Sequence, residues 1–236
     1  MKLAKKTALV TGATGGLGTV VAGMFRREGA NLVIPYHSER SRAGSPPELS
    51  SGPDTLLIKA DLAHDADAEL CVVEGAERFG SIDFLINLAG GYEPGKEIHE
   101  TTSGDVDGMI HLNFTTAHLV TRHALRYMYR SGFGRVVFIA ALAATRTRAK
   151  SGAYAIAKHA VVTLTRILAE EVKGSGITVN AIAPGTILTP ANRAAMPSAH
   201  AEKWVTPEEI GSLILYLCGE EARAVNGNIL LMDGGM

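Results

Sequence analysis

The sequence predicts one doubly wound α/β domain over residues 1–236, with a seven-stranded parallel sheet and helices on both faces. Short apolar runs alternate with longer stretches of helical periodicity along the chain. The runs are apolar at successive positions, as strands buried on two faces are. Neither an internal repeat nor an interdomain linker interrupts the alternation. Right-handed crossovers and a single parallel sheet follow from this pattern.

The expected elements follow the alternation in order. The strands are the short apolar runs at Thr7–Val10, Asn31–Pro35, Thr55–Ala60, Asp83–Asn87, Arg135–Ala140, Ile177–Ile182 and Ile229–Met232. The helices are the longer periodic segments at Gly16–Glu28, Asp65–Phe79, Val106–Arg130, Ala153–Lys173 and Pro207–Cys218.

Two segments rich in helix-breaking residues depart from the alternation. A crossover helix would normally lie between Tyr36 and Asp54, but this stretch is rich in Ser, Pro and Gly. Because proline interrupts helices, we expect a surface loop there, beside the first two strands. The second segment, Pro184–Pro197, is expected to form a mobile lid.

Composition and charge exclude several classes of protein. Apolar residues make up 46% and charged residues 20%, which excludes a disordered chain. Lys and Arg number 23 against 24 Asp and Glu, with no basic stripe, so we expect no nucleic-acid partner. The longest apolar run, Val136–Ala144, has nine residues, whereas a membrane span needs about 20. We therefore expect no membrane partner.

The cysteines and histidines indicate a reducing compartment and no metal site. Cys71 and Cys218 are isolated, which is typical of core thiols in the cytoplasm, the expected location. The eight His residues show no metal-ligand spacing with carboxylate support, so we expect no metal. A serine hydrolase is not supported because the chain has no Gly-x-Ser-x-Gly motif.

A glycine-rich turn, Thr11–Gly18, joins the first expected strand to the first expected helix. Its glycines at 12, 16 and 18 allow a sharp reversal, a close approach of the backbone to a pyrophosphate, and packing of helix on strand. The helix N-terminus then offers free N–H groups and a partial positive charge to the phosphates. This placement predicts a nucleotide site; a merely flexible turn is the alternative.

The TGxxxGxG spacing of the turn resembles the short-chain dehydrogenase/reductase superfamily, and four further motifs extend the resemblance nearly end to end. They are Asp61-Leu62, like the pair that holds the adenine ring; Asn87-Leu88-Ala89-Gly90, like the NNAG turn with Leu for the second Asn; Pro184-Gly185 followed by Thr189, like the turn on the nicotinamide carboxamide; and the ending Asp233-Gly234-Gly235. The resemblance implies a Rossmann-type sheet in the order 3-2-1-4-5-6-7, a nicotinamide dinucleotide, a small-molecule substrate and a homodimer or homotetramer.

The positions expected to bind the cofactor follow these motifs and the end of the second strand. They are Gly12, Thr14, Gly16, Leu17, Gly18, His37, Arg40, Asp61, Leu62, Asn87, Ala89, Gly90, Tyr154, Lys158, Pro184, Gly185, Thr186, Ile187 and Thr189.

The end of the second expected strand bears on the choice of dinucleotide. NAD-selective members place an acid there, on the ribose hydroxyls. Here the place falls on Tyr36, followed by His37, and the nearest acid is Glu39. A site that lacks this acid and has His and Arg nearby can accommodate a 2′-phosphate. Arg40 and Arg42 therefore favour NADP(H), and NAD(H) remains the alternative cofactor. The alternative is that both arginines are solvated loop charges.

A tyrosine and a lysine four residues apart, Tyr154 and Lys158, share one face of an expected helix. An ammonium about 4 Å from the phenol is worth about 4 kcal/mol at an effective dielectric near 20. It would lower the pKa of the tyrosine towards the working pH, so that the phenol can donate a proton as hydride reaches the substrate. Asn113 matches the Asn of the superfamily's catalytic tetrad, which implies that it holds a water relaying protons to Lys158. Surface or packing roles are the alternative.

The serine of that tetrad is missing. The superfamily normally places it at the end of the fifth strand, where this chain has Ala141 preceded by Ala140. The nearest hydroxyls belong to Thr145, Thr147 and Ser151. Either the site is weak or dead on ordinary carbonyls, or its substrate is already activated.

A closer resemblance supports the activated substrate. The dihydropteridine reductase branch carries Ala in place of that serine and reduces quinonoid dihydropterin, a conjugated electrophile. Three stretches resemble this branch: residues 89–92 its AGGW turn, residues 140–144 its Ala-rich strand end, and residues 189–197 followed by Trp204 its TPxNRxxMP lid. The Thr11-Gly12 turn, Asn180 and the DGG ending belong instead to the general superfamily pattern.

The sequence thus predicts an NAD(P)H-dependent oxidoreductase that transfers hydride to a small activated substrate, such as a quinonoid dihydropteridine, with Tyr154 as proton donor. One alternative is a general ketone or 3-oxoacyl reductase that works without the serine. The other is a dinucleotide-binding sensor or scaffold without turnover. Ala141 favours the sensor, whereas the presence of Tyr154, Lys158 and Asn113 argues against it.

Overall fold

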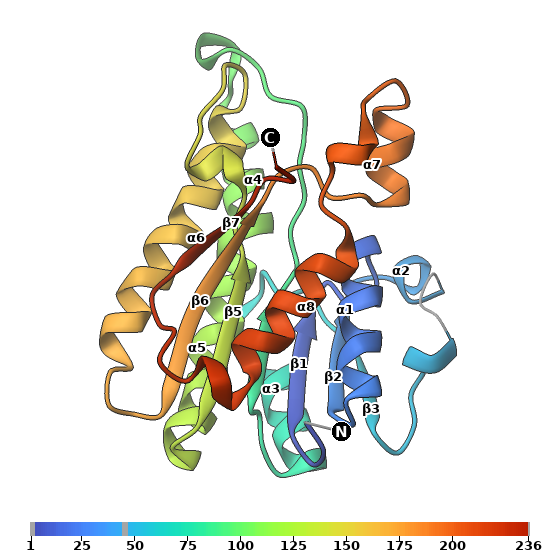
Figure 1. Ribbon diagram of the computed structural model, residues 1–236, viewed down its shortest axis with the longest axis vertical. Helices are drawn as coiled ribbons and strands as arrows, with labels where there is room; N and C mark the ends of the chain where they lie inside the picture. The colour runs from blue at the N-terminus through green and yellow to red at the C-terminus, as the bar shows by residue number, and fades with distance from the viewer. Residues whose placement is uncertain (1–2, 44–46, 236) are drawn as a thin grey trace.

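A seven-stranded parallel sheet forms the centre of the structure, a computed structural model that describes residues 3–43 and 47–235 (Figure 1). The strand order is β3-β2-β1-β4-β5-β6-β7, which confirms the predicted fold class and order. The strands are β1 (Thr7–Thr11), β2 (Asn31–Tyr36), β3 (Thr55–Lys59), β4 (Phe84–Asn87), β5 (Gly134–Ile139), β6 (Ile177–Pro184) and β7 (Ile229–Met232).

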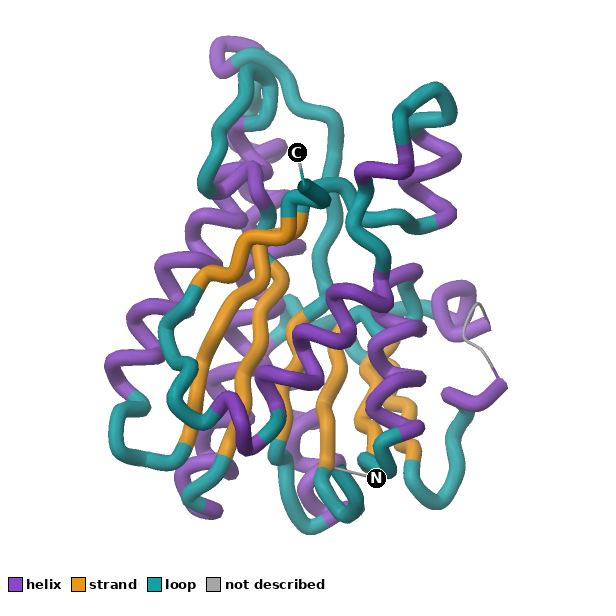
Figure 2. Tube along the Cα trace, viewed as in Figure 1, coloured by secondary structure: helices purple, strands orange, loops and turns teal. Residues whose placement is uncertain are grey.

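Helices cover both faces of the sheet (Figure 2). One face carries α1 (Gly16–Arg27) and α8 (Pro207–Cys218); the other carries α3 (Asp65–Phe79), α5 (Thr116–Ser131) and α6 (Gly152–Glu171). Shorter helices are α2 (Glu39–Ala43), α4 (Ser103–Ile110) and α7 (Pro190–Ala195). The doubly wound arrangement predicted from the alternation is therefore present.

Side-chain alternation along the strands divides the core between these two faces. In β1, Ala8 and Val10 pack in the cluster beneath α1 and α8, whereas Leu9 packs in the cluster beneath α3, α5 and α6. All three are fully buried, which explains why the strand reads as an unbroken apolar run. Burial of a Val or Leu side chain contributes about 1.5–3 kcal/mol.

The helix expected over Val106–Arg130 is two helices joined by a π-helical turn. The first of them, α4, starts earlier than expected because Thr102 and Asp105 form a reciprocal capping box. The π-helical turn spans His111–Thr115 and contains Asn113. Turns of this kind are frequent at functional sites.

The stretch between Tyr36 and Asp54, expected to be a surface loop, contains α2 and a 3-10 turn that ends at Leu49. Helix α2 forms because Ser38 Oγ accepts a hydrogen bond from the Ser41 amide at 3.2 Å. Leu49 is 1% exposed and packs in the core beneath α1. The described part of the expected surface loop therefore contains two short helical pieces that the sequence did not predict, and residues 44–46 lie outside the described residues.

Loops after the strands gather at the carboxyl edge of the sheet, at the top of Figure 1. Helix α7 lies in the segment expected to be a lid, Pro184–Pro197, and stands away from the sheet. Thr189 caps α7, since its Oγ1 accepts from the Asn192 amide at 3.2 Å. That this segment moves as a lid stays a prediction.

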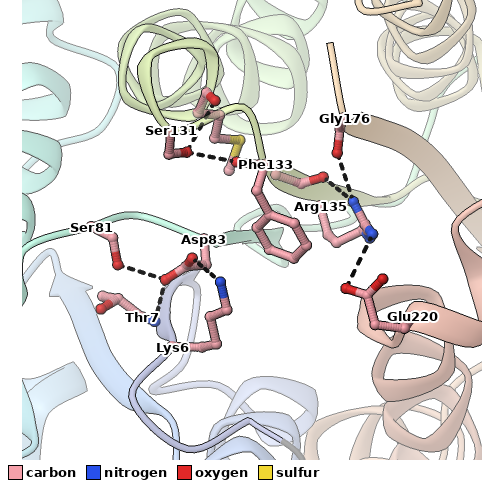
Figure 3. A network of polar contacts seen from close by, with 11 residues as sticks. Lys6, Thr7, Ser81, Asp83, Ser131, Phe133, Arg135, Gly176 and Glu220 are labelled. Carbon is pink, nitrogen blue, oxygen red and sulfur yellow. Dashed lines mark hydrogen bonds and ion pairs between the residues drawn. The ribbon is translucent and has the colours of Figure 1, made fainter. Parts of the chain in front are cut away.

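At the opposite, amino edge of the sheet, two cations lie on the ring of Phe133 (Figure 3). Lys6 Nζ is 4.1 Å and Arg135 Cζ is 4.5 Å from the ring centroid. Asp83 Oδ1 accepts from Lys6 at 2.8 Å, and Glu220 Oε1 lies 3.9 Å from Arg135. This network ties the starts of β1, β4 and β5 together, away from the loops described next.

Candidate active site

The glycine-rich turn after β1 lies directly against the turn after β4. Gly12 has a φ of +66°, and a Cβ added there would lie 2.8 Å from Ala89 N and 2.9 Å from the Leu88 carbonyl. Thr11 Oγ1 accepts hydrogen bonds from the amides of Leu88 and Ala89 at 3.1 and 3.0 Å. Only glycine combines this backbone conformation with this approach.

Helix α1 starts from that turn without a side-chain cap, since Gly15 is its N-cap. A Cβ at Gly18 would lie 2.0 Å from the Gly12 carbonyl oxygen, so this glycine allows the helix to pack against the turn. A Cβ at Gly16 would lie 3.1 Å from Thr189, which borders the turn from the other side. The space around Gly12, Gly16 and Gly18, which side chains at these positions would fill, is called the glycine cradle below. The free amides in the first turn of α1 lie beside it, and this arrangement suits the phosphates of a dinucleotide.

Residues expected at the adenosine half of the cofactor lie at the ends of the paired strands β2 and β3. His37 and Arg40 follow β2 and are exposed. Asp61 and Leu62 follow β3, where Asp61 Oδ1 accepts from the Ala63 amide at 3.0 Å and Leu62 is buried. The fold therefore brings these four residues to one side of the carboxyl edge.

The two arginines expected near Tyr36 differ in what they contact. Arg42 lies 3.3 Å from Glu39, and its guanidinium carbon is 5.7 Å from the centroid of the Tyr36 ring. Glu39 also accepts a hydrogen bond from the Tyr36 hydroxyl at 3.4 Å. Arg40 is exposed. Arg42 is therefore paired with Glu39, the acid nearest to Tyr36, which the sequence argument did not place on the ribose.

The side chain of Asn87 points to α5, and the expected contact of Asn87 with the cofactor stays a prediction. It is 4% exposed, and its Nδ2 donates to Thr121 Oγ1 on α5 at 3.2 Å. This bond directs the amide into the helix layer, so the side chain ties β4 to α5. The neighbouring backbone of Ala89 is what reaches the cradle.

The segment that follows β6 is held in place by Val205. The Val205 amide donates to the Thr186 carbonyl at 2.9 Å, and Val205 forms a parallel bridge with Ile187. Pro184 is the last residue of β6, and Gly185 follows it. This short ladder carries the expected nicotinamide segment to the same edge as the glycine-rich turn.

Tyr154 and Lys158 lie near the start of α6, at the end of β5. Lys158 is 5% exposed, and its Nζ donates to the Ile139 carbonyl at 2.9 Å. Burial lowers the pKa of Lys158 to about 8. Burial, with a smaller contribution from Tyr92, raises the pKa of Tyr154 to about 12. The expected lowering of the tyrosine pKa was therefore wrong for this structure, because burial disfavours the charged phenolate and the neighbouring Tyr92 adds to the rise.

Asn113 reaches the same place from the π-helical turn. Its Oδ1 accepts from the Gly91 amide and its Nδ2 donates to the Gly91 carbonyl, both at 3.1 Å. A Cβ at Gly90 would lie 2.6 Å from Asn113 Oδ1 and 3.2 Å from Lys158 Nζ. The structure thus brings Asn113 and Lys158 together beside Gly90. The water that Asn113 is expected to hold stays a prediction.

Ala141 follows β5 and is 7% exposed. The hydroxyls of Thr145 and Ser151 donate to backbone carbonyls three residues earlier, at 3.0 and 2.7 Å. Thr147 is exposed and forms no hydrogen bond with a described residue. The hydroxyls of Thr145 and Ser151 are therefore engaged within their own turns.

Tyr92 has a contact that the sequence reasoning missed. Its ring centroid lies 5.1 Å from that of Tyr154, with the planes at 87°. The available signal was an aromatic residue directly after the glycines that follow β4. Gly91 was likewise missed as the partner of Asn113, because a backbone partner leaves no mark in the sequence.

Similarity to known proteins extends over nearly the whole chain. Residues 12–236 match the family profile described as Enoyl-(Acyl carrier protein) reductase. The chain is 32% identical over 253 residues to D-beta-hydroxybutyrate dehydrogenase of Cupriavidus necator, covering 98% of this chain and 97% of that protein. The chain belongs to the short-chain dehydrogenase/reductase superfamily. It is thus an NAD(P)-dependent oxidoreductase, as the sequence predicted.

Other relatives of this short-chain dehydrogenase/reductase carry reductase and dehydrogenase names. Levodione reductase of Leifsonia aquatica is 33% identical over 249 residues, covering 98% of this chain and 93% of that protein. The crystal structure of a short-chain dehydrogenase/reductase from Brucella melitensis, named a glucose/ribitol dehydrogenase, has a TM-score of 0.90 at 31% identity and covers 99% of this chain and 97% of its own.

Two further features of the described residues bear on partners. None of the described helices has the length and apolar character that crossing a membrane requires. Within residues 3–43 and 47–235, no three His, Cys, Asp or Glu side chains are grouped so as to hold a metal ion.

Proposed function

We propose that this oxidoreductase reduces a small activated substrate, with Tyr154 as the proton donor and residues 1–236 acting as one catalytic domain. One observation carries the proposal: Tyr154 and the Lys158–Asn113 pair lie at the carboxyl edge of the sheet that also bears the glycine cradle. Ligands of open α/β sheets bind at this edge. A bound nicotinamide dinucleotide supplies the hydride for such a reduction.

The proposed binding residues divide between the two ends of the dinucleotide. The cradle at Gly12 and the start of α1 hold the pyrophosphate, and the segment from Pro184 to Thr189 borders the nicotinamide. Asp61 and Leu62 take the adenine end. We propose NADP(H) over NAD(H), because Arg40 is exposed just after β2 and its guanidinium is able to meet a 2′-phosphate.

The catalytic groups have complementary tasks in this proposal. Tyr154 donates its phenolic proton to the substrate oxygen or nitrogen as hydride arrives. Lys158 is able to replace that proton, since its pKa of about 8 lets it lose and regain a proton near neutral pH. Asn113 fixes Gly91, so that Gly90 stays between the amide and the lysine.

Ala141 favours a substrate that needs little help at the reacting atom. A serine hydroxyl there would donate a hydrogen bond to the developing oxyanion, whereas the nearby hydroxyls of Thr145 and Ser151 donate to backbone carbonyls. A quinonoid dihydropteridine fits, because hydride delivery restores a stable conjugated ring. A general ketone or 3-oxoacyl reductase is the second candidate, favoured by the names of the relatives.

Association of the chain with copies of itself is also part of the proposal. Ile156 and Ile167 on α6 are each 51% exposed, which supports a homodimer or homotetramer. We place the protein in the cytoplasm because both cysteines are free and buried.

A panel assay tests the proposed function. NADPH and NADH oxidation is followed with quinonoid dihydropteridine, quinones and ordinary ketones. We expect turnover with activated substrates that is at least tenfold faster than with ketones. Rapid reduction of ketones alone would establish the second candidate, and tight cofactor binding with no turnover on any compound would overturn the proposal.

A further inference from the structure

We propose that Tyr92 is a positioning residue for Tyr154: it holds the phenol ring in place in a site where Ala141 offers no hydroxyl to do so. This inference rests on the proposed function in one respect, the role of Tyr154 as proton donor. The contact itself is independent of that role.

The contact between the two rings has a favourable geometry. Their centroids are 5.1 Å apart and their planes make an angle of 87°, an edge-to-face arrangement that aromatic pairs prefer. Tyr154 forms no hydrogen bond with residues 3–43 or 47–235. Among the described residues, packing contacts therefore position the Tyr154 ring.

The backbone beside Tyr92 is fixed on its N-terminal side. Gly91, the preceding residue, exchanges two hydrogen bonds of 3.1 Å with the side chain of Asn113. Asn113 is 1% exposed and lies within the π-helical turn. Tyr92 therefore extends from an anchored point, although its own side chain is 61% exposed.

The chain after Tyr92 forms a strap, residues 92–102, that lies against the residues just before Tyr154. A Cβ at Gly95 would lie 1.9 Å from the Lys150 carbonyl oxygen, and one at Gly152 would lie 2.7 Å from Ile98 Cδ1. The backbone contact leaves no room for a side chain at Gly95, whereas at Gly152 the neighbouring atom is the end of the flexible Ile98 side chain. The start of α6 and the strap are therefore in close contact.

Two ion pairs hold the strap from both sides. Glu97 lies 3.5 Å from Lys150, before α6, and Lys96 lies 3.0 Å from Asp105, on α4. Asp105 also accepts from the Thr102 amide at 2.8 Å, where the strap ends. The strap is therefore connected to α4, which leads into the π-helical turn of Asn113, and to the residues just before α6, which carries Tyr154. These connections give Tyr92 a defined position relative to the phenol.

Substitution of Tyr92 separates positioning from substrate contact. Tyr92→Leu removes the ring, and Tyr92→Phe keeps it. We expect kcat to fall at least tenfold in Tyr92→Leu, with the KM values for substrate and cofactor within about threefold of wild type, and Tyr92→Phe to recover most of kcat. Tyr216→Leu is the matched control, since Tyr216 is an exposed tyrosine on α8. A raised KM with unchanged kcat would mean that Tyr92 contacts substrate, which overturns the proposal. Kinetic constants of Tyr92→Leu equal to those of wild type would also overturn it.

A double mutant tests the link to position 141. If Tyr92 performs the orienting task of a missing hydroxyl, Ala141→Ser should increase kcat more in the Tyr92→Leu background than in wild type. Equal fold-changes in the two backgrounds would contradict the link.

A measurement without turnover keeps this inference apart from the proposed function. In protein labelled with 13C-tyrosine, the Tyr154 ring signal is assigned by its loss in Tyr154→Phe. Tyr92→Leu should shift that signal and speed the flipping of the Tyr154 ring, whereas Tyr216→Leu should not. An unaltered signal would overturn the inference even in an active enzyme; a shifted signal in a protein inactive on every substrate would retain the contact and reject the function.

Discussion

Gly12 and Ala89 lie so close that no side chain fits between them. A Cβ at Gly12 would come within 2.8 Å of the Ala89 nitrogen, and the φ of +66° at Gly12 itself disfavours other residues. Two turns that are far apart in the sequence thus form one wall of the cradle.

Substitution of Gly12 should therefore affect cofactor binding more than an ordinary helix glycine does. Gly12→Ala combines left-handed strain of about 1–2 kcal/mol with a backbone collision, so we expect dinucleotide affinity to fall at least tenfold and the free energy of unfolding to decrease. Gly108→Ala on α4 is the control: its Cβ would meet nothing within 4 Å, and it should stabilise by up to about 1 kcal/mol. Titration and urea unfolding measure both; wild-type affinity in Gly12→Ala would contradict the cradle.

Replacement of the proposed proton donor should separate chemistry from binding. Tyr154→Phe keeps the ring and its contact with Tyr92 but removes the hydroxyl. We expect unchanged cofactor affinity and a turnover reduced by about 10²-fold or more. Steady-state kinetics beside a cofactor titration check this, and full turnover in the variant would rule out the assignment.

Cofactor preference should depend on Arg40 more than on Arg42. Arg42 is paired with Glu39 at 3.3 Å, whereas Arg40 is exposed just after β2. We expect NADPH to bind more tightly than NADH, and Arg40→Ala to weaken NADPH binding while NADH binding stays the same. The control is Arg42→Ala, with a smaller effect. NADH binding tenfold tighter than NADPH binding would reject the preference.

Restoring a hydroxyl at position 141 should help poor substrates most. One oxyanion donor is worth about 2.7–4 kcal/mol, or 10²–10³ in rate. Ala141→Ser should therefore raise kcat/KM for simple ketones and change it little for a quinonoid substrate, which narrows the gap between them. A gap that stays the same would show that the missing hydroxyl does not set substrate choice.

The buried lysine should leave a signature in the pH dependence of stability. The pKa of Lys158 falls from 10.5 to about 8 on burial. Between these values the unfolded chain binds a proton that the folded chain does not, so stability attributable to Lys158 rises with pH, by at most about 1.4 kcal/mol per pH unit. Urea unfolding of wild type and Lys158→Met between pH 7.5 and 10 should show this difference in slope; parallel curves would contradict it.

The sequence argument located elements and motifs better than side-chain partners. Alternating apolar runs fix the sheet because each strand is buried on two faces, and the order of strands followed from motif resemblance. The π-helical turn at Asn113 was not foreseen, since the bonds from Asn113 to Gly91 form only once two distant segments meet. Local periodicity carries no sign of such a bond.

The pKa values of Tyr154 and Lys158 were also not predictable from the spacing of these residues in the sequence. A separation of four residues places Lys158 on the same helix face, but it does not report burial. In the structure the lysine is 5% exposed and donates to Ile139. Desolvation, a property of the assembled fold, therefore decides the direction of both pKa values.

The cations on Phe133 open a practical route for engineering this enzyme. They lie at the amino edge of the sheet, about 20 Å along a six-residue strand from the end near Ala141. Effects of substitutions that far apart usually add. Substitutions around the buried Arg135 can therefore be screened for heat tolerance with little direct effect on the site. Libraries that randomise the residues around Tyr92 can then start from a stabilised variant. Such a variant tolerates the loss of stability that substitutions for a new substrate preference bring.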